Sequence, residues 1–101
     1  MSNEVEKLDE NAEIPVRYEV EENVIEVDKV NRIARRLLLS QTKKLRKKYK
    51  HLKGKKDDQG RSATIVIRMP KKGSLSLECV IEYPEGFSSE IDGSEKAVRV
   101  S

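Results

Sequence analysis

The most distinctive chemistry in this chain is a concentration of positive charge in residues 32–56. This segment carries twelve Lys and Arg side chains and neither Asp nor Glu. Cations of this kind neutralise the phosphates of a nucleic acid and release condensed counterions, a gain that needs no base-specific geometry. The segment therefore predicts a partner that carries many negative charges.

A helix would place most of these cations on one side. At about 100° per residue, eight of them project within an arc of about 120°, opposite an apolar stripe. We call these eight the predicted cationic arc: Arg32, Arg35, Arg36, Lys43, Arg46, Lys47, Lys50 and Lys53. Leu39 lies within the same arc. Lys71 and Lys72, at the tip of a predicted hairpin, extend the candidate nucleic-acid-binding surface.

Three interpretations of the arc remain open: a nucleic acid, an acidic protein, or simple solvation of a helix face. Solvated faces commonly mix charges, because Glu four residues before Lys supports a helix whereas like charges at that spacing repel. The arc accepts this repulsion between Arg32 and Arg36 and between Lys43 and Lys47. A polyanionic partner is therefore the better explanation.

We predict a non-catalytic nucleic-acid-binding protein, and we place RNA slightly ahead of DNA. No Asn or Gln projects from the arc, which favours recognition of backbone or shape over direct readout of bases. The alternative is a protein-interaction module, an adaptor or inhibitor, that docks on an acidic partner.

Catalytic and metal chemistry lack the residues they need. His51 is the only histidine and Cys79 the only cysteine. Without a second His or Cys nearby, neither a metal-ligand set nor a pair of nucleophile and base can be assembled. We predict that Cys79 is a small buried residue, that His51 is structural, and that Asp57 and Asp58 are exposed loop acids. No enzymatic activity, cofactor or metal is expected.

Hydrophobic periodicity predicts the elements that position the arc. Residues 14–20 alternate as a half-buried strand, and residues 24–27 are consistent with a short partner strand. A helix is expected over about 29–53, capped by Asp28 or Asn31. Its apolar stripe consists of Val30, Ile33, Ala34, Leu37, Leu38, Leu45, Tyr49 and Leu52.

Two features of that helix concern its continuity. Gly54 supplies the stop, because glycine adopts the left-handed conformation at a helix end without a steric penalty. A break near Ser40, with a second helix capped by Ser40 or Thr42, is the alternative to one continuous helix.

The clearest alternation of polar and apolar residues lies in residues 62–84, where Pro70 and Gly73 mark a turn between two strands. Val66 and Val80 fall on the outward face of this hairpin, where they are either isolated surface valines or a contact in a homodimer. The expected fold class is α+β: a small antiparallel β-sheet packed against one long amphipathic basic helix, as a single domain over 14–101.

Charge is segregated along the chain. Residues 1–28 carry ten acidic and two basic side chains, whereas residues 29–56 carry thirteen basic and no acidic ones. Residues 1–13 are expected to be an acidic disordered segment, which could compete with nucleic acid for the arc. Charge asymmetry of this kind indicates an electrostatic partner.

The lone cysteine points to a reducing compartment, and no apolar run approaches the roughly 20 residues of a membrane span. We predict an intracellular, cytoplasmic protein without a membrane partner. The run KKLRKKYK at 43–50 is also consistent with nuclear import.

Overall fold

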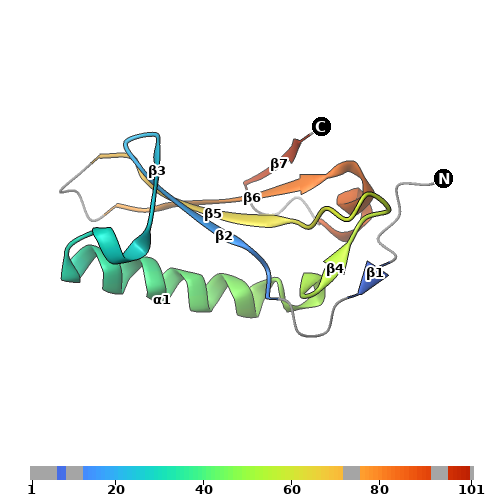
Figure 1. Cartoon of the computed structure of the whole chain (residues 1–101), viewed down its shortest axis with the longest axis horizontal. Helices are drawn as coiled ribbons and strands as arrows, with labels where there is room; N and C mark the ends of the chain where they lie inside the picture. Colours follow the sequence, from blue (N-terminus) through green and yellow to red (C-terminus); the bar gives the residue numbers. More distant parts are fainter. Residues whose placement is uncertain (1–6, 9–12, 72–75, 92–95, 101) are drawn as a thin grey trace.

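The computed structural model describes residues 7–8, 13–71, 76–91 and 96–100. One long helix, α1 (Arg32–Lys48), packs against one face of a five-stranded sheet with the strand order β3-β2-β5-β6-β7 (Figure 1). The strands of this sheet are β2 (Val16–Val20), β3 (Asn23–Ile25), β5 (Thr64–Met69), β6 (Glu78–Pro84) and β7 (Ala97–Val100). The predicted α+β class is confirmed.

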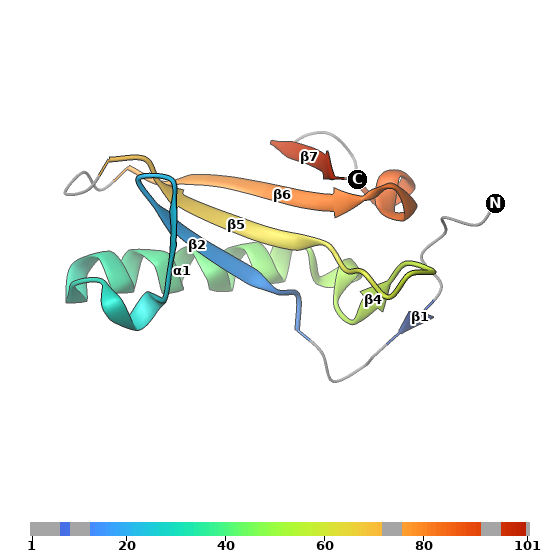
Figure 2. The ribbon, with the colours of Figure 1, turned by 45° about the horizontal axis from the view of Figure 1, so that its top comes forward.

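The sheet is mixed, whereas an antiparallel sheet was predicted. β2 runs parallel to β5, and β6 runs parallel to β7. The pairs β2–β3 and β5–β6 are antiparallel hairpins, so the predicted hairpin is present. Parallel neighbours need a long crossover connection, and α1 supplies it before β5 (Figure 2). Alternation along one strand does not reveal the direction of its neighbour, which is why the parallel pairs were missed.

α1 begins directly after Asn31, whose side-chain oxygen accepts a hydrogen bond from the Ala34 amide at 2.9 Å. Of the two predicted caps, Asn31 is therefore the one used. Asp28 lies in a preceding short 3-10 helix, η1 (Val27–Lys29). The helix continues through Ser40, so the alternative of two separate helices is wrong.

α1 ends at Lys48, earlier than the predicted end near residue 53. Tyr49 leaves the helical conformation with φ −102° and ψ 28°, and the chain tightens into the 3-10 helix η2 (Lys50–Leu52). Gly54 follows with φ +74°, the left-handed conformation expected of it. The tighter turn of η2 brings Leu52 into the core, where it is 2% exposed.

The side of α1 that faces the sheet is centred on Leu38, with Ala34 and Thr42 also buried. This direction is rotated by about 60° from the centre of the predicted apolar stripe, and Ile33 is consequently 63% exposed. Thr42 tolerates burial because its hydroxyl donates to the Leu38 carbonyl at 2.8 Å and lies 2.7 Å from the Tyr18 hydroxyl. The Thr42 hydroxyl has one proton and donates it to Leu38, so the Tyr18 hydroxyl is the donor in the second bond.

The core lies between α1 and the sheet. Its fully buried apolar side chains come from every layer and include Phe87, Leu38, Leu52, Ile65, Ile67 and Ile81. Phe87 is supplied by the 3-10 helix η3 (Glu85–Glu90), which follows β6. Aliphatic residues fill most of this interior, because the chain has only one Phe, three Tyr and no Trp.

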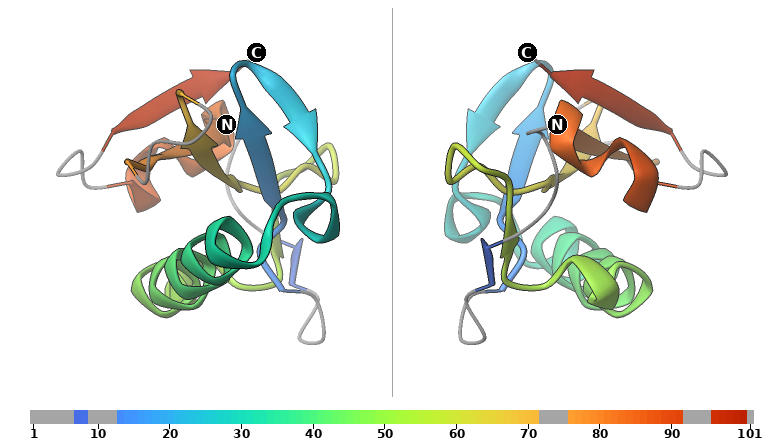
Figure 3. Two further views of the ribbon diagram at one scale, coloured as in Figure 1. Left: turned by 90° about the vertical axis from the view of Figure 1, so that its left-hand side faces the viewer. Right: turned by 90° about the vertical axis from the view of Figure 1, so that its right-hand side faces the viewer.

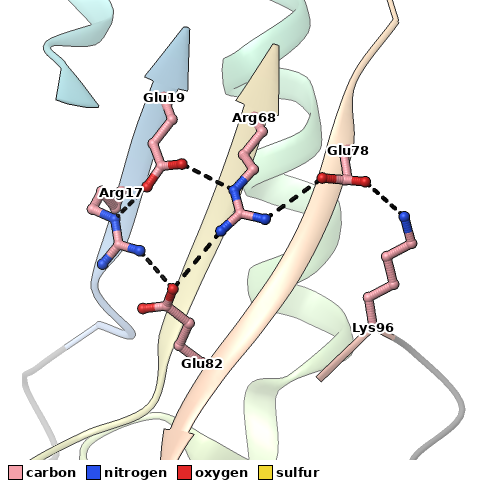
Figure 4. A network of polar contacts seen from close by, with 6 residues as sticks. All are labelled: Arg17, Glu19, Arg68, Glu78, Glu82 and Lys96. Atoms are coloured by element: carbon pink, nitrogen blue, oxygen red, sulfur yellow. Dashed lines mark hydrogen bonds and ion pairs between the residues drawn. The ribbon is translucent and has the colours of Figure 1, made fainter. Parts of the chain in front are cut away.

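Val66 and Val80 do not form an exposed patch on the outer face of the sheet. They are 0% and 5% exposed and lie opposite each other on β5 and β6. On the β2 side, the register partner of Val66 is Arg17. Arg17 belongs to a group of charged side chains that spreads across this face of the sheet (Figure 4). The basis for predicting a homodimer contact at these valines is therefore removed.

These charged side chains form what we call the outer-face ion-pair network, which runs from β2 to the start of β7. Its closest contacts are Arg17 to Glu82 at 2.6 Å, Lys96 to Glu78 at 2.7 Å, and both Arg17 and Arg68 to Glu19 at 2.9 Å. The aliphatic stems of long charged side chains can cover apolar surface while the charged ends remain solvated.

A second, two-stranded pairing joins β1 (Lys7–Leu8) to β4 (Lys55–Lys56) in antiparallel register. β1 lies within the segment that was predicted to be disordered; residues 1–6 and 9–12 of that segment lie outside the described residues, as does the hairpin tip at 72–75. In the part of the chain that is described, no helix is long and apolar enough to cross a membrane.

Candidate nucleic-acid interface

The outward side of α1 carries five exposed cations, which we call the cationic helix face: Arg32, Arg36, Lys43, Lys44 and Lys47. From first to last they extend about 22 Å along the helix axis, at 1.5 Å per residue. Within residues 13–71, 76–91 and 96–100, none of the five side chains makes an ion pair. Their backbone is held in place because the opposite side of α1 packs on the sheet.

Two members of the predicted arc have acidic neighbours. Arg35 lies 3.4 Å from Asp28, and Lys53 lies 3.3 Å from Glu13. All four of these side chains are more than 40% exposed. Exposed ion pairs contribute only about 0–1 kcal/mol, so a phosphate can replace either carboxylate at little cost.

Arg46 has a structural role instead. Its guanidinium donates to the Ile14 carbonyl at 3.2 and 3.4 Å, just before β2 begins, and the side chain is half-buried. The rotation of α1 explains this placement, because it turns Arg46 toward the edge of the sheet. We therefore remove Arg46 from the candidate binding residues.

The remaining predicted residues lie beyond α1. Lys50 is exposed in η2, and Lys71 is exposed after the end of β5. The end of β5 lies at the same end of the molecule as the start of α1 (Figures 1 and 2). Lys72 falls outside the described residues.

One group of carboxylates lies on the other side of the sheet from α1. Glu19, Glu78 and Glu82 belong to the outer-face ion-pair network, and Glu21 and Glu22 form the exposed turn between β2 and β3. Seen nearly end-on, α1 stands as a separate layer on the opposite face of the sheet (Figure 3). The folded molecule thus keeps its cationic helix face apart from these acidic side chains.

The hydrogen bonds of the network favour the charged forms of its members. Burial by itself would raise the pKa of Glu19, but hydrogen bonds from Arg17 and Arg68 outweigh burial and hold that pKa below its usual value. The hydrogen bond to Glu82 raises the pKa of Arg17, and the one to Glu19 raises the pKa of Arg68. Arg68 therefore pairs with carboxylates of the network and does not extend the cationic surface.

The residues considered for catalysis lie apart. His51 is exposed in η2, with Nε2 at 3.2 Å from the Glu90 carbonyl oxygen. Cys79, which we predicted to be buried, is only half-buried on β6, and burial together with the charge of Glu78 raises the pKa of its thiol. No cluster of three or more His, Cys, Asp or Glu that could hold a metal ion occurs among the residues that the structure describes.

Asp57 is buried, contrary to the prediction that both loop acids are exposed. It is 1% exposed, and its carboxylate accepts from the amides of Gln59 at 3.0 Å and Arg61 at 2.7 Å and from Arg61 Nε at 2.9 Å. These bonds close the loop between β4 and β5. Asp58, its neighbour, has a buried Oδ1 without a hydrogen-bond partner among the described residues.

Sequence reasoning missed Lys44 as a member of the face and Ile33 as an exposed residue. Both follow from the rotation of α1, since the predicted stripe was centred too far toward Ile33. A signal was present in Thr42, whose hydroxyl can bond back to the preceding turn of a helix and so enter an apolar interface. Leu39 was predicted to lie among the cations and is 42% exposed there.

No family model, curated protein or solved structure matches this chain.

Proposed function

We propose that this protein is a non-catalytic nucleic-acid-binding module that holds the phosphate backbone of its ligand against the cationic helix face. The observation that carries the proposal is the exposure of five cations on one rigid helix, without an ion pair among the described residues. Other cations of the chain do pair with carboxylates, as Arg17, Arg61 and Arg68 illustrate. No carboxylate of the described residues forms an ion pair with the cationic helix face.

The like-charged side chains of the cationic helix face repel one another and so lower the stability of α1. Arg32 and Arg36, and likewise Lys43 and Lys47, stand four residues apart on the same side of α1. Each like-charge pair at this spacing destabilises a helix by about 0.2–0.5 kcal/mol. A phosphate backbone converts this repulsion into attraction and releases counterions as it binds. The face is therefore better explained by a ligand than by solvation.

Charge reversal on the face is the direct test. The variant Arg36→Glu/Lys43→Glu/Lys47→Glu should lose at least about a hundredfold in affinity for a mixed-sequence 20-mer at physiological salt, because phosphate contacts supply nearly all non-specific affinity. Fluorescence anisotropy measures the loss, and circular dichroism verifies that the variant is folded.

A matched pair of single variants controls for net charge. Lys47→Glu and Arg99→Glu make the same change of charge, but Arg99 is exposed on the edge strand β7, away from α1. Lys47→Glu should weaken binding several-fold more than Arg99→Glu. Equal losses would mean that overall charge, and not this face, determines affinity.

An acidic protein is the second candidate ligand, and one observation favours it. Ile33 and Leu39 are 63% and 42% exposed on α1, beside the cations. Protein interfaces are anchored by buried apolar residues and depend less on salt than contacts with phosphates do. If Ile33→Ser/Leu39→Ser abolishes binding to an acidic protein recovered with the chain, while nucleic acid does not bind, the second candidate replaces the first.

A further inference from the structure

We propose, on the basis of the proposed function, that the ligand is double-stranded DNA of B form and that α1 lies along its major groove. The proposal rests on two independent features of the structure: the placement of the aromatic side chains and the distribution of cations around α1. It places DNA ahead of RNA, the reverse of the order expected from sequence.

The aromatic side chains of this chain are not placed to stack the bases of a single-stranded nucleic acid. Proteins that bind single-stranded nucleic acid stack exposed bases on aromatic rings. The four aromatic residues of this chain all lie in its described part, and none is exposed. Phe87 and Tyr49 are 0% and 8% exposed, Tyr18 is half-buried with its hydroxyl bonded to Thr42, and Tyr83 is half-buried on β6.

Cations occupy the front and both flanks of the exposed side of α1. At about 100° per residue, Arg36, Lys43 and Lys47 point most directly away from the sheet. Arg32 lies on one flank and Lys44 on the other, both exposed. A groove presents the same arrangement of negative charge, with a phosphate backbone on each side of the inserted helix. A ligand that touched only one side would leave one flank unused.

The dimensions favour the B form. An α-helix with its side chains is about 10–12 Å across, and the major groove of B-DNA is about 12 Å wide and admits a helix. The major groove of an RNA duplex is too deep and narrow for side chains to read. α1 can enter a groove because it forms the outermost layer on its side of the sheet (Figure 3).

This placement also suggests what the front of α1 contacts. The side chains of Arg36, Lys43 and Lys47 point into the groove and are long enough to reach the phosphates that border it. The small Ser40, also exposed, lies between them and leaves room for close approach. We therefore expect recognition of the backbone and of groove shape rather than strict sequence specificity.

The test measures the binding of the full chain to four labelled 20-mers of one sequence. They are duplex DNA, duplex RNA, single-stranded DNA and single-stranded RNA. Duplex DNA should bind at least about tenfold more tightly than the other three. A fifth ligand is the same DNA duplex with bulky glucosyl-hydroxymethyl groups on its cytosines, which fill the major groove and leave the phosphates unchanged. It should bind at least about tenfold more weakly than plain duplex.

The outcomes separate this inference from the function on which it rests. If none of the ligands binds, the proposed function itself is wrong. If single strands or duplex RNA bind as tightly as duplex DNA, or if the modified duplex binds as tightly as the plain one, nucleic-acid binding stands and the major-groove placement is overturned. Ser40→Glu, an exposed substitution at the front of α1, should abolish duplex binding without unfolding the protein.

Discussion

At the scale of single residues, the turn between β2 and β3 carries conformational strain. Glu21 and Glu22 have φ of +49° and +71°, and they separate the paired residues Val20 and Asn23. Two consecutive positive φ values define the tight hairpin turn that Asn and Gly normally occupy. Glutamate pays a steric penalty in this region that glycine does not.

The strain predicts a stabilising substitution. Glu22→Gly should raise the free energy of unfolding by about 1 kcal/mol, because relief of the left-handed conformation exceeds the added entropy of the unfolded chain. The control is Glu26→Gly, at an exposed residue with φ −91°, which should be neutral or destabilising. Urea unfolding measures both. A Glu22→Gly variant that is less stable than the wild type would show that the turn is not strained.

Asp57 is the residue whose protonation matters most for the loop between β4 and β5. Burial by itself would raise the pKa of Asp57, but hydrogen bonds from Arg61 and Gln59 outweigh burial and hold that pKa below its usual value. A carboxyl with a lowered folded-state pKa stabilises the fold above its unfolded pKa of about 3.9. That contribution is lost as the pH falls through the folded-state pKa.

Replacement of the Asp57 carboxylate should lower the free energy of unfolding only at a pH at which the carboxylate is charged. Asp57→Ala should lower the free energy of unfolding by about 2–3 kcal/mol at pH 7, since it leaves the amides of Gln59 and Arg61 and the Arg61 guanidinium without their acceptor. The difference from the wild type should shrink as the pH falls below about 4. Asp58→Ala is the matched control and should not lower stability, because Asp58 Oδ1 is buried without a partner in the described structure and its removal relieves the cost of desolvation. A deficit that is equal at pH 7 and pH 2 would contradict this account.

At the scale of elements, the periodic segments were predicted well. The sequence predicted the β5–β6 hairpin, the strand β2 and a helix cap at Asn31, because alternation and capping are local properties of the sequence. Hydrophobic periodicity alone did not give the direction in which α1 faces. Thr42 is polar and was left out of the apolar stripe, yet it is buried against the sheet. Its hydroxyl lies 2.7 Å from that of Tyr18, a contact between two elements that the periodicity of one element does not reveal.

Neighbouring leucines test the observed orientation of α1. Leu38 is 0% exposed and Leu39 is 42% exposed. Leu38→Ala should lower the free energy of unfolding by about 2–5 kcal/mol, the range for deletion of a fully buried leucine. Leu39→Ala should cost less than about 1 kcal/mol. Thermal or urea unfolding of the two variants gives the answer, and equal losses would mean that the helix is oriented differently.

At the scale of the whole molecule, the sequence indicated a segregation of charge but not where the fold would place it. Outward cations on α1 were expected and are observed for Arg32, Arg36, Lys43 and Lys47. The outer-face ion-pair network was not expected, because its six residues come from distant segments and meet only through the register of four strands. Burial of Val66 and Val80 under that network was missed for the same reason.

The salt dependence of affinity is the measurement that tests the central claim most directly. If the cationic helix face makes five phosphate contacts with a DNA duplex, the logarithm of the binding constant should fall with the logarithm of salt concentration with a slope of about −4.5. Lys43→Ser/Lys47→Ser should reduce the magnitude of that slope by about two. A variant slope equal to that of the wild type, with unchanged affinity, would show that the phosphates are bound elsewhere on the molecule.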